Sequence, residues 1–281
     1  RLYGPSSRDA IRTAVPLEAP LRLYRIVVLV IVVIFRLNRV LIIQKNNSAS
    51  LAPLGVCGII YVLMTTTQSP PILAIVNQKG GVGKTTTAIN LACYLAEFGH
   101  KTLLIDADPQ ANSTSGIGLD QAQLTHSLYD ILIDPAQLEH ALCPSPFPRL
   151  HVIPGHQNLA SIDLDIGSMV SRETRLKDCL APLHPFYDFM IIDCPPAINL
   201  ITVNAMVAAT ASIIPVQCEY FALEGLAYLT KTQVLIRENF NPTLDLLGIL
   251  PTMYDSRTSL NRQVIANIES VFPNQVFSAI P

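Results

Sequence analysis

The chain has 281 residues, half of them hydrophobic and only 14% charged, which is enough to bury the core of one large α/β domain. Residues 64–281 hold eleven Lys and Arg against nineteen Asp and Glu. The net negative charge of this part of the chain repels the phosphates of nucleic acids. Any nucleic-acid contact must therefore come from a local basic patch or from a partner.

Residues 1–63 differ from the rest of the chain, with eight Lys and Arg against two acids. Residues 26–35 form an apolar run between Arg25 and Arg36, but ten residues are too few to span a bilayer. Met64 and a short polar leader follow. We therefore expect residues 1–63 to be a non-native or unstructured upstream extension. A membrane anchor is the alternative hypothesis.

A glycine-rich loop at residues 78–86 lies between an apolar strand expected at 72–76 and a helix expected at 86–98. This strand–loop–helix order is the context that a phosphate-binding loop requires. Glycines let backbone N–H groups approach a polyphosphate, and the helix N-terminus adds positive potential. The alternative is a plain turn. The predicted nucleotide-binding residues are Gly80, Gly81, Val82, Gly83, Lys84, Thr85 and Thr86.

Two side chains of this loop have specific predicted roles. Lys84 would reach the β- and γ-phosphates of ATP, and the Thr85 hydroxyl would bind Mg²⁺. The usual phosphate-loop pattern has a glycine where this chain has Gln78, and this chain adds Lys79. The loop is therefore a variant form.

A second expected strand, residues 101–106, ends in Asp106, and Asp108 follows two positions later. Side chains at that spacing share one face of a continuing strand, so both carboxylates are predicted to point toward the metal and the γ-phosphate. Residues 109–120 are rich in Ser, Thr, Asn and Gly and are expected to form a mobile loop. The alternative for Asp108 is a solvated turn.

A third apolar strand, residues 188–193, ends in Asp193. A strand-end aspartate in this position is predicted to hold Mg²⁺, through water because the ion keeps much of its hydration shell. Pro195 and Pro196 would stiffen a loop that senses the γ-phosphate. The alternative is a carboxylate that caps the next turn.

Strands and helices alternate through the rest of the chain. This predicts a doubly wound α/β fold, with a mostly parallel sheet flanked by helices and the motif loops at one edge. Short helices are expected at 126–143. The other expected strands are 150–154, 211–216, 245–250 and 276–280, and the other expected helices are near 157–168, 171–182, 198–209, 222–239 and 258–271.

Five motifs in order resemble the ParA/MinD ATPases, and most closely their ParA (Soj-like) branch. Residues 79–86 match the deviant Walker A loop of that phosphate-loop NTPase class, and the resemblance covers roughly residues 71–281. The other matching segments are 104–112, 191–196, 215–225 and 251–257. The resemblance implies that Asp108 orients the attacking water and that Asp106 lies near Mg²⁺. It also implies that Lys79 crosses a dimer interface to the partner's nucleotide and acts in catalysis with Lys84.

The resemblance implies a slow ATPase that a ParB-like partner stimulates. Its ATP-sandwiching homodimer would bind DNA non-specifically, hydrolysis would release monomers, and the cycle would partition chromosomes or plasmids. It implies a cytoplasmic, nucleoid-associated protein, with membrane binding not expected. Arg257 is the candidate for DNA contact. Residues 64–281 would form the ATPase domain, truncated at its C-terminus because family members continue beyond the last expected strand.

Three alternatives stay open at this point. A MinD-like ATPase that cycles on membranes would need a C-terminal amphipathic helix beyond Pro281. A relative of the nitrogenase iron protein would need cysteines that bridge two subunits, and the six cysteines show no such pair. They are expected instead to be reduced thiols, several of them buried. The third alternative is an inactive fragment that keeps the loop but cannot complete its adenine pocket.

Overall fold

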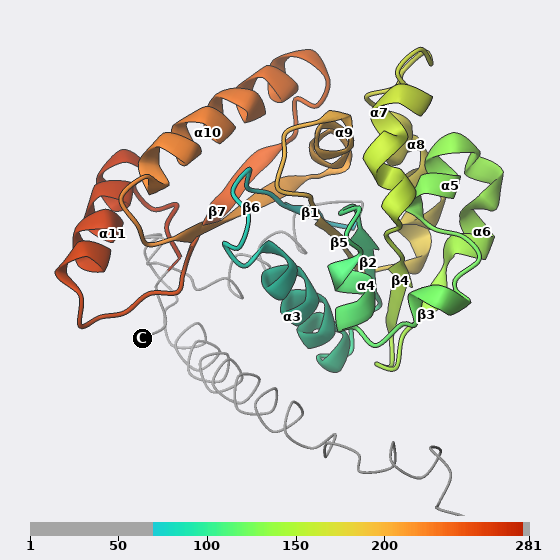
Figure 1. Ribbon diagram of the computed structural model, residues 1–281, viewed down its shortest axis with the longest axis horizontal. Helices are drawn as coiled ribbons and strands as arrows, with labels where there is room; N and C mark the ends of the chain where they lie inside the picture. Colours follow the sequence, from blue (N-terminus) through green and yellow to red (C-terminus); the bar gives the residue numbers. More distant parts are fainter. Residues whose placement is uncertain (1–69, 278–281) are drawn as a thin grey trace, which may run out of the picture. The chain divides into compact units, whose positions relative to one another are not determined.

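The computed structural model describes residues 70–277 (Figure 1). The expectations for residues 1–63, including the possible anchor at 26–35, lie outside the described residues. None of the helices in the described part of the chain is long and apolar enough to cross a membrane. Of the strand expected at 276–280, Val276 forms a single parallel bridge with Ile249, and residues after 277 are not described.

A seven-stranded sheet forms the centre of the described domain, in the order β3-β4-β2-β5-β1-β6-β7. Six strands run parallel, and only the short edge strand β3 is antiparallel to its neighbour. The strands are β1 (Ile72–Ile75), β2 (Thr102–Asp106), β3 (Cys143–Pro144), β4 (Leu150–Ile153), β5 (Phe189–Asp193), β6 (Ala211–Gln217) and β7 (Asp245–Thr252).

The central strands are buried on both faces, as their continuous apolar sequences predict. Every residue of β1, β2 and β5 is buried, including the polar ones. Such strands need helices on both sides of the sheet. The longer helices are α3 (Lys84–Glu97), α9 (Leu200–Ala208), α10 (Ala222–Asn239) and α11 (Ser259–Val271).

The helices cover opposite faces of the sheet. α3 packs against β1, β2 and β5, whereas α9 and α10 lie on the other side (Figure 1). The predicted doubly wound, mostly parallel fold is therefore confirmed. The shorter helices are α4 (Asn112–Gly116), α5 (Leu128–Ile133), α6 (Leu138–Ala141), α7 (Ile162–Asp165) and α8 (Arg175–Leu180).

Two details differ from the sequence-based expectation. Residues 109–120 are not one loop, because 112–116 form α4, whose Ser113 and Thr114 are fully buried. A run of small polar residues predicts a loop from composition, but here hydrogen bonds to buried carboxylates stabilise a helical turn. The edge strand β3 was also not expected, because its two residues are too few to show a pattern.

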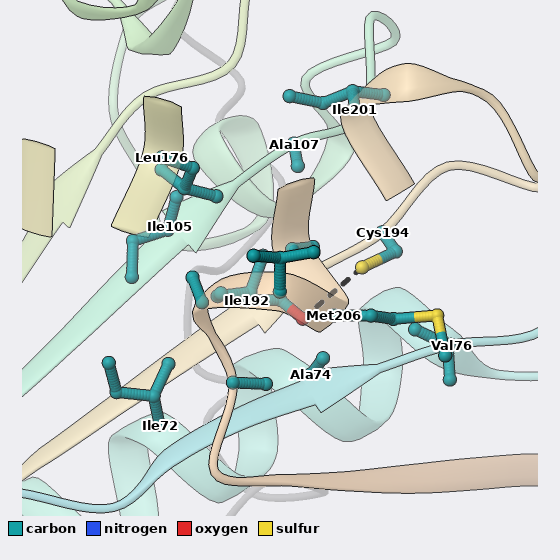
Figure 2. Packing of buried hydrophobic residues seen from close by; sticks show 14 of the residues in the cluster. Ile72, Ala74, Val76, Ile105, Ala107, Leu176, Ile192, Cys194, Ile201 and Met206 are labelled. Carbon is teal, nitrogen blue, oxygen red and sulfur yellow. Dashed lines mark hydrogen bonds between the residues drawn. The ribbon is translucent and has the colours of Figure 1, made fainter. Parts of the chain in front are cut away.

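Buried side chains on the face of the sheet that α9 and α10 cover form one continuous core (Figure 2). Ile105 and Ile192 come from neighbouring strands, and Met206 reaches the same region from α9. The thiols of Cys179 and Cys194 are buried in this core, which confirms the expectation that several cysteines are packing residues.

Candidate phosphate and magnesium site

The carboxyl ends of three central strands lie side by side. Asp193 at the end of β5 is paired in register with Asp106 at the end of β2 and with Ile75 at the end of β1. The glycine loop follows β1 directly. Because the strands are parallel, residues from three distant parts of the sequence meet at one edge of the sheet, which is where open α/β sheets bind their ligands.

The glycine loop has the backbone shape that its sequence predicts. Gly81 and Gly83 have φ angles of 76° and 92°, in the left-handed region that other residues rarely adopt. Gly83 precedes α3, and no side chain caps that helix N-terminus. The first-turn N–H groups are therefore available for an anion. Thr252 at the end of β7 donates a hydrogen bond to the Val82 carbonyl at 2.8 Å, which supports the loop from the far strand.

Lys84 is held inside the loop. Its side chain is buried, and its Nζ donates to the Lys79 carbonyl at 2.9 Å. Loss of water lowers the pKa of Lys84 from its ordinary value, and the attraction of Asp193 and Asp108 partly opposes that change. The ammonium group is thus pre-placed among two carboxylates and the turned backbone, where a polyphosphate would add further opposite charge.

Asp193 is fully buried and has one carboxylate oxygen without a partner. Its Oδ2 accepts a hydrogen bond from the Ser113 hydroxyl at 2.6 Å, while its Oδ1 has no hydrogen-bond partner among the described residues. Burial raises the pKa of Asp193 to about 6, although the nearby hydroxyl groups of Ser113 and Thr85 lower it. A buried, unpaired carboxylate oxygen is costly unless another group, such as a cation, binds it.

Asp106 is bound more completely by the protein. Its Oδ2 accepts from the backbone N–H and the hydroxyl of Thr114, at 2.8 and 2.7 Å, and its Oδ1 accepts from the Asp108 N–H at 3.2 Å. Burial and the neighbouring charge of Asp193 raise the pKa of Asp106 to about 7. Both oxygens of Asp106 already have partners, so its direct contact with Mg²⁺ stays a prediction.

The sequence left two alternatives for Asp108, a carboxylate near the metal and the γ-phosphate or a solvated turn, and the structure has features of both. Its Oδ1 accepts a hydrogen bond from the Gln110 N–H at 2.9 Å, which is the turn expected of an Asp-Pro-Gln sequence. The residue is nevertheless 7% exposed rather than solvated, and its charge acts on both Lys84 and Asp193. The structure therefore brings Asp108 into the same cluster.

The donor atoms in this cluster fit Mg²⁺. Thr85, Asp106 and Asp193 offer only oxygen, and Mg²⁺ binds through one or two protein oxygens together with water and phosphate. Within residues 70–277, no group of three or more His, Cys, Asp or Glu is arranged to hold a metal by itself. The unpaired Oδ1 of Asp193 is the atom that fits the ion best.

Lys79 points away from this cluster to the surface. Its side chain is 47% exposed and forms an ion pair with Glu219, in the loop after β6. Asn77 Oδ1 accepts from the Lys79 N–H at 3.0 Å and fixes the backbone there. Both Lys79 and Glu219 line an open cavity of about 620 Å³, together with Gln78, Phe221 and Tyr228.

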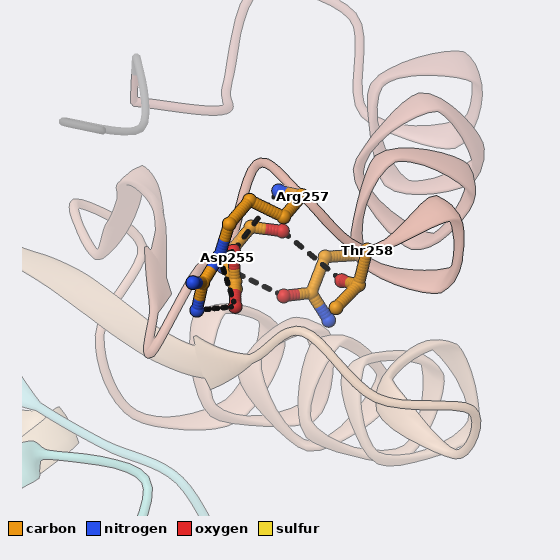
Figure 3. Close-up of polar contacts among 4 residues, drawn as sticks. Asp255, Arg257 and Thr258 are labelled. Carbon is orange, nitrogen blue, oxygen red and sulfur yellow. Dashed lines mark hydrogen bonds and ion pairs between the residues drawn. The ribbon is translucent and has the colours of Figure 1, made fainter.

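Arg257 lies in the turn after β7, where it faces Asp255 (Figure 3). Its side chain is 88% exposed, and its Nε and Nη2 donate to the Asp255 carboxylate at 2.9 and 2.8 Å. This pairing holds the pKa of Asp255 below its ordinary value. Arg257 is accessible but already paired, so its contact with DNA stays a prediction.

Three residues near the carboxylates were not identified from sequence. Ser113 and Thr114 bind Asp193 and Asp106, and Gly155 after β4 donates its N–H to the Thr114 hydroxyl at 3.0 Å. A side chain at Gly155 would lie 2.8 Å from the Asp108 carbonyl. The run of hydroxyl residues soon after Asp108 could have predicted these contacts, because buried carboxylates need hydrogen-bond donors.

Comparison with known proteins places this chain in a family. Residues 71–246 match the family model described as an AAA domain. The chromosome partitioning protein ParA of Myxococcus xanthus is 46% identical over 209 residues, covering 74% of each chain. The sporulation initiation inhibitor protein Soj of Bacillus subtilis is 44% identical over 209 residues, covering 74% of this chain and 83% of its own.

Solved structures share the fold. Cobyrinic acid a,c-diamide synthase from Mycobacterium smegmatis, with bound ADP and magnesium, matches with a TM-score of 0.69 at 37% identity, over 72% of this chain and 82% of its own. A plasmid partition protein from Borrelia burgdorferi matches with a TM-score of 0.63 at 27% identity, over 72% and 86%. Nucleotide and magnesium are thus bound by a protein of similar fold and sequence.

Proposed function

Because the chain belongs to the ParA/Soj family of partition ATPases, we propose that it works as an ATP-dependent dimer in chromosome or plasmid partition. The ATP-bound homodimer binds DNA non-specifically, and hydrolysis returns it to free monomers. A ParB-like partner stimulates that slow hydrolysis. The protein acts in the cytoplasm, at the nucleoid. The relatives named for partitioning are more similar in sequence than the synthase structure, which favours partition over amide synthesis.

The observation that carries the proposal is the meeting of Lys84, Asp108 and Asp193 beside the turned glycine loop. Phosphoryl transfer needs positioned charge more than proton chemistry. The first-turn N–H groups of α3 and the Lys84 ammonium bind the phosphates. Thr85 and Asp193 hold Mg²⁺, and Asp106 supports them from the next strand.

Asp108 orients the attacking water with its carboxylate. When bound, Mg²⁺ neutralises charge that develops on the β- and γ-phosphate oxygens. The burial of Asp108 and Lys84 supports these roles, because charges act more strongly on a substrate where water is excluded.

Lys79 supplies the intersubunit contact. Its exposed ammonium group lies at an open cavity rather than among the groups of its own phosphate site. In the dimer it contacts the partner's nucleotide and contributes positive charge to the transition state, as an arginine finger does. ATP is therefore sandwiched between two subunits, and assembly depends on nucleotide.

DNA binding depends on a local patch, because the domain as a whole is acidic. Arg257 is the exposed arginine that we assign to this contact, released from Asp255 when phosphate competes for it. Such binding should weaken strongly as salt concentration rises.

The test is ATP turnover by the full chain, alone, with DNA, and with DNA plus a ParB-like partner. We expect slow turnover that rises with both additions, and sedimentation as a dimer only with ATP. Lys84→Ala serves as the control and should abolish nucleotide binding. A chain that binds ATP no better than Lys84→Ala contradicts the proposal. Retention on DNA, compared with flotation on anionic vesicles, separates partition from membrane cycling.

A further inference from the structure

Two buried hydroxyl residues at the start of α4 bind the two strand-end carboxylates. The Ser113 hydroxyl donates to Asp193 Oδ2 at 2.6 Å, and the Thr114 hydroxyl donates to Asp106 Oδ2 at 2.7 Å. Both hydroxyl residues have no exposed surface. Each of these hydroxyl groups therefore donates its hydrogen bond to a carboxylate of the site rather than to water.

The backbone just before these two hydroxyl residues is strained. Ala111, just before α4, has a φ angle of 51°, in the left-handed region that costs a non-glycine residue energy. Ala111 is itself buried, and its N–H donates to the Asp108 carbonyl at 2.9 Å. The bend turns the first residues of α4 back onto the strand ends. Strain kept at such a position indicates that the contacts it permits are needed.

The two carboxylates are held in different ways. Both oxygens of Asp106 accept hydrogen bonds from the protein, whereas only Oδ2 of Asp193 does. The Ser113 hydroxyl thus fixes one oxygen of Asp193 and leaves Oδ1 buried without a partner. A carboxylate with one oxygen fixed cannot rotate freely, so its other oxygen keeps a single direction.

We propose that Ser113 is a positioning residue for Mg²⁺, which orients Asp193 so that its Oδ1 faces the ion. This inference rests on the proposed function, which supplies ATP and Mg²⁺. Groups that hydrogen-bond a metal-binding carboxylate typically change metal affinity 10- to 100-fold when removed. Ser113 therefore determines the Mg²⁺ requirement, that is, the Mg²⁺ concentration that nucleotide binding needs, although it does not contact the nucleotide.

The experiment measures binding rather than turnover. A fluorescent, non-hydrolysable ATP analogue is titrated into the full chain in EDTA and at increasing Mg²⁺ concentrations. In Ser113→Ala, the Mg²⁺ concentration that gives half of the maximal gain in affinity should rise about 10- to 100-fold. Binding in EDTA should not change, because the glycine loop and Lys84 are intact.

Two further variants make the test specific. Ser115→Ala is the matched control, since Ser115 lies in the same helix but its hydroxyl bonds neither carboxylate. That hydroxyl donates to the Ala111 carbonyl at 3.3 Å and accepts from Gln121 Nε2 at 2.8 Å. Ser115→Ala should keep the parent's Mg²⁺ requirement. Ser113→Cys keeps the buried volume with a weaker donor, so it should fold and show an intermediate shift. It serves where Ser113→Ala is too unstable to measure.

An unchanged Mg²⁺ requirement in Ser113→Ala and Ser113→Cys, with the parent dependent on Mg²⁺, overturns this inference alone. If Ser113→Ala weakens binding of the ATP analogue equally with and without Mg²⁺, the inference is also overturned, because the substitution then disrupts the site as a whole. A parent chain that binds no analogue under any condition overturns the proposed function and this inference together.

Discussion

Lys79 and Glu219 form an ion pair although 140 residues separate them in sequence. The pair joins the phosphate loop after β1 to the loop after β6, because these two strands are neighbours in the sheet. In the single chain, Glu219 therefore holds the lysine that we assign to the partner's nucleotide. Lys79 cannot keep this pair and also cross to a second subunit.

Replacing Glu219 should consequently favour assembly. Exposed ion pairs stabilise by about 0.2–1 kcal/mol, and a dimer releases two of them, so Glu219→Gln should lower the dimer dissociation constant with ATP about 2- to 30-fold. Analytical ultracentrifugation with a non-hydrolysable ATP analogue measures this constant. Glu224→Gln is the matched control, since Glu224 lines the same cavity and has no ion pair among the described residues. Weaker dimerisation of Glu219→Gln would show that Glu219 serves the interface instead.

Lys79→Ala should separate nucleotide binding from assembly. Its backbone carbonyl still accepts from Lys84, so the phosphate loop keeps its shape and ATP binding should stay within a few-fold of the parent. Dimerisation with ATP should be lost, and turnover should fall on the order of 10³-fold if Lys79 acts as an arginine finger does. Nucleotide titration and ultracentrifugation of the same sample check both parts. A Lys79→Ala chain that still dimerises with ATP would refute the crossing role.

The sequence predicted most of the fold and the outline of the site, for physical reasons. Continuous apolar runs predict strands buried on both faces, and the glycine pattern predicts left-handed turns that few other sequences allow. It did not predict the contact of Lys79 with Glu219, because that contact depends on the order of strands in the sheet. Nor did it predict the burial of Ser113 and Thr114, whose polar side chains are typical of loops until buried carboxylates need them as donors.

Asp106 should make the stability of the nucleotide-free chain depend on pH. Its pKa is raised from 3.8 to about 7 in the folded protein, so the protonated form is favoured by folding. This stabilisation is complete below pH 3.8 and is lost as pH rises through 7. The measured quantity is the free energy of unfolding of the parent minus that of Asp106→Asn, both without Mg²⁺. This difference should fall by about a few kcal/mol between about pH 4 and 7, the size expected for such a pKa shift. Urea denaturation at several pH values measures it, and a constant difference from pH 5 to 8 would contradict the assignment.

Gly155 should tolerate no side chain, although nothing in its own backbone angles requires glycine. A Cβ atom there would lie 2.8 Å from the Asp108 carbonyl and 2.9 Å from Asp106 Cγ. Neither atom can move away easily, because Asp106 is held by Thr114 and by the sheet. Gly155→Ala should therefore lower the free energy of unfolding by about 1–3 kcal/mol and displace both carboxylates, which weakens Mg²⁺-dependent nucleotide binding. Gly225→Ala is the control: its Cβ would meet only Gln78 Nε2, at 3.8 Å, and alanine in a helix should leave stability equal or up to about 1 kcal/mol higher. Equal unfolding free energies for Gly155→Ala and the parent would show that the strand end can move, and that the carboxylates are less rigidly placed than the contacts of Gly155 indicate.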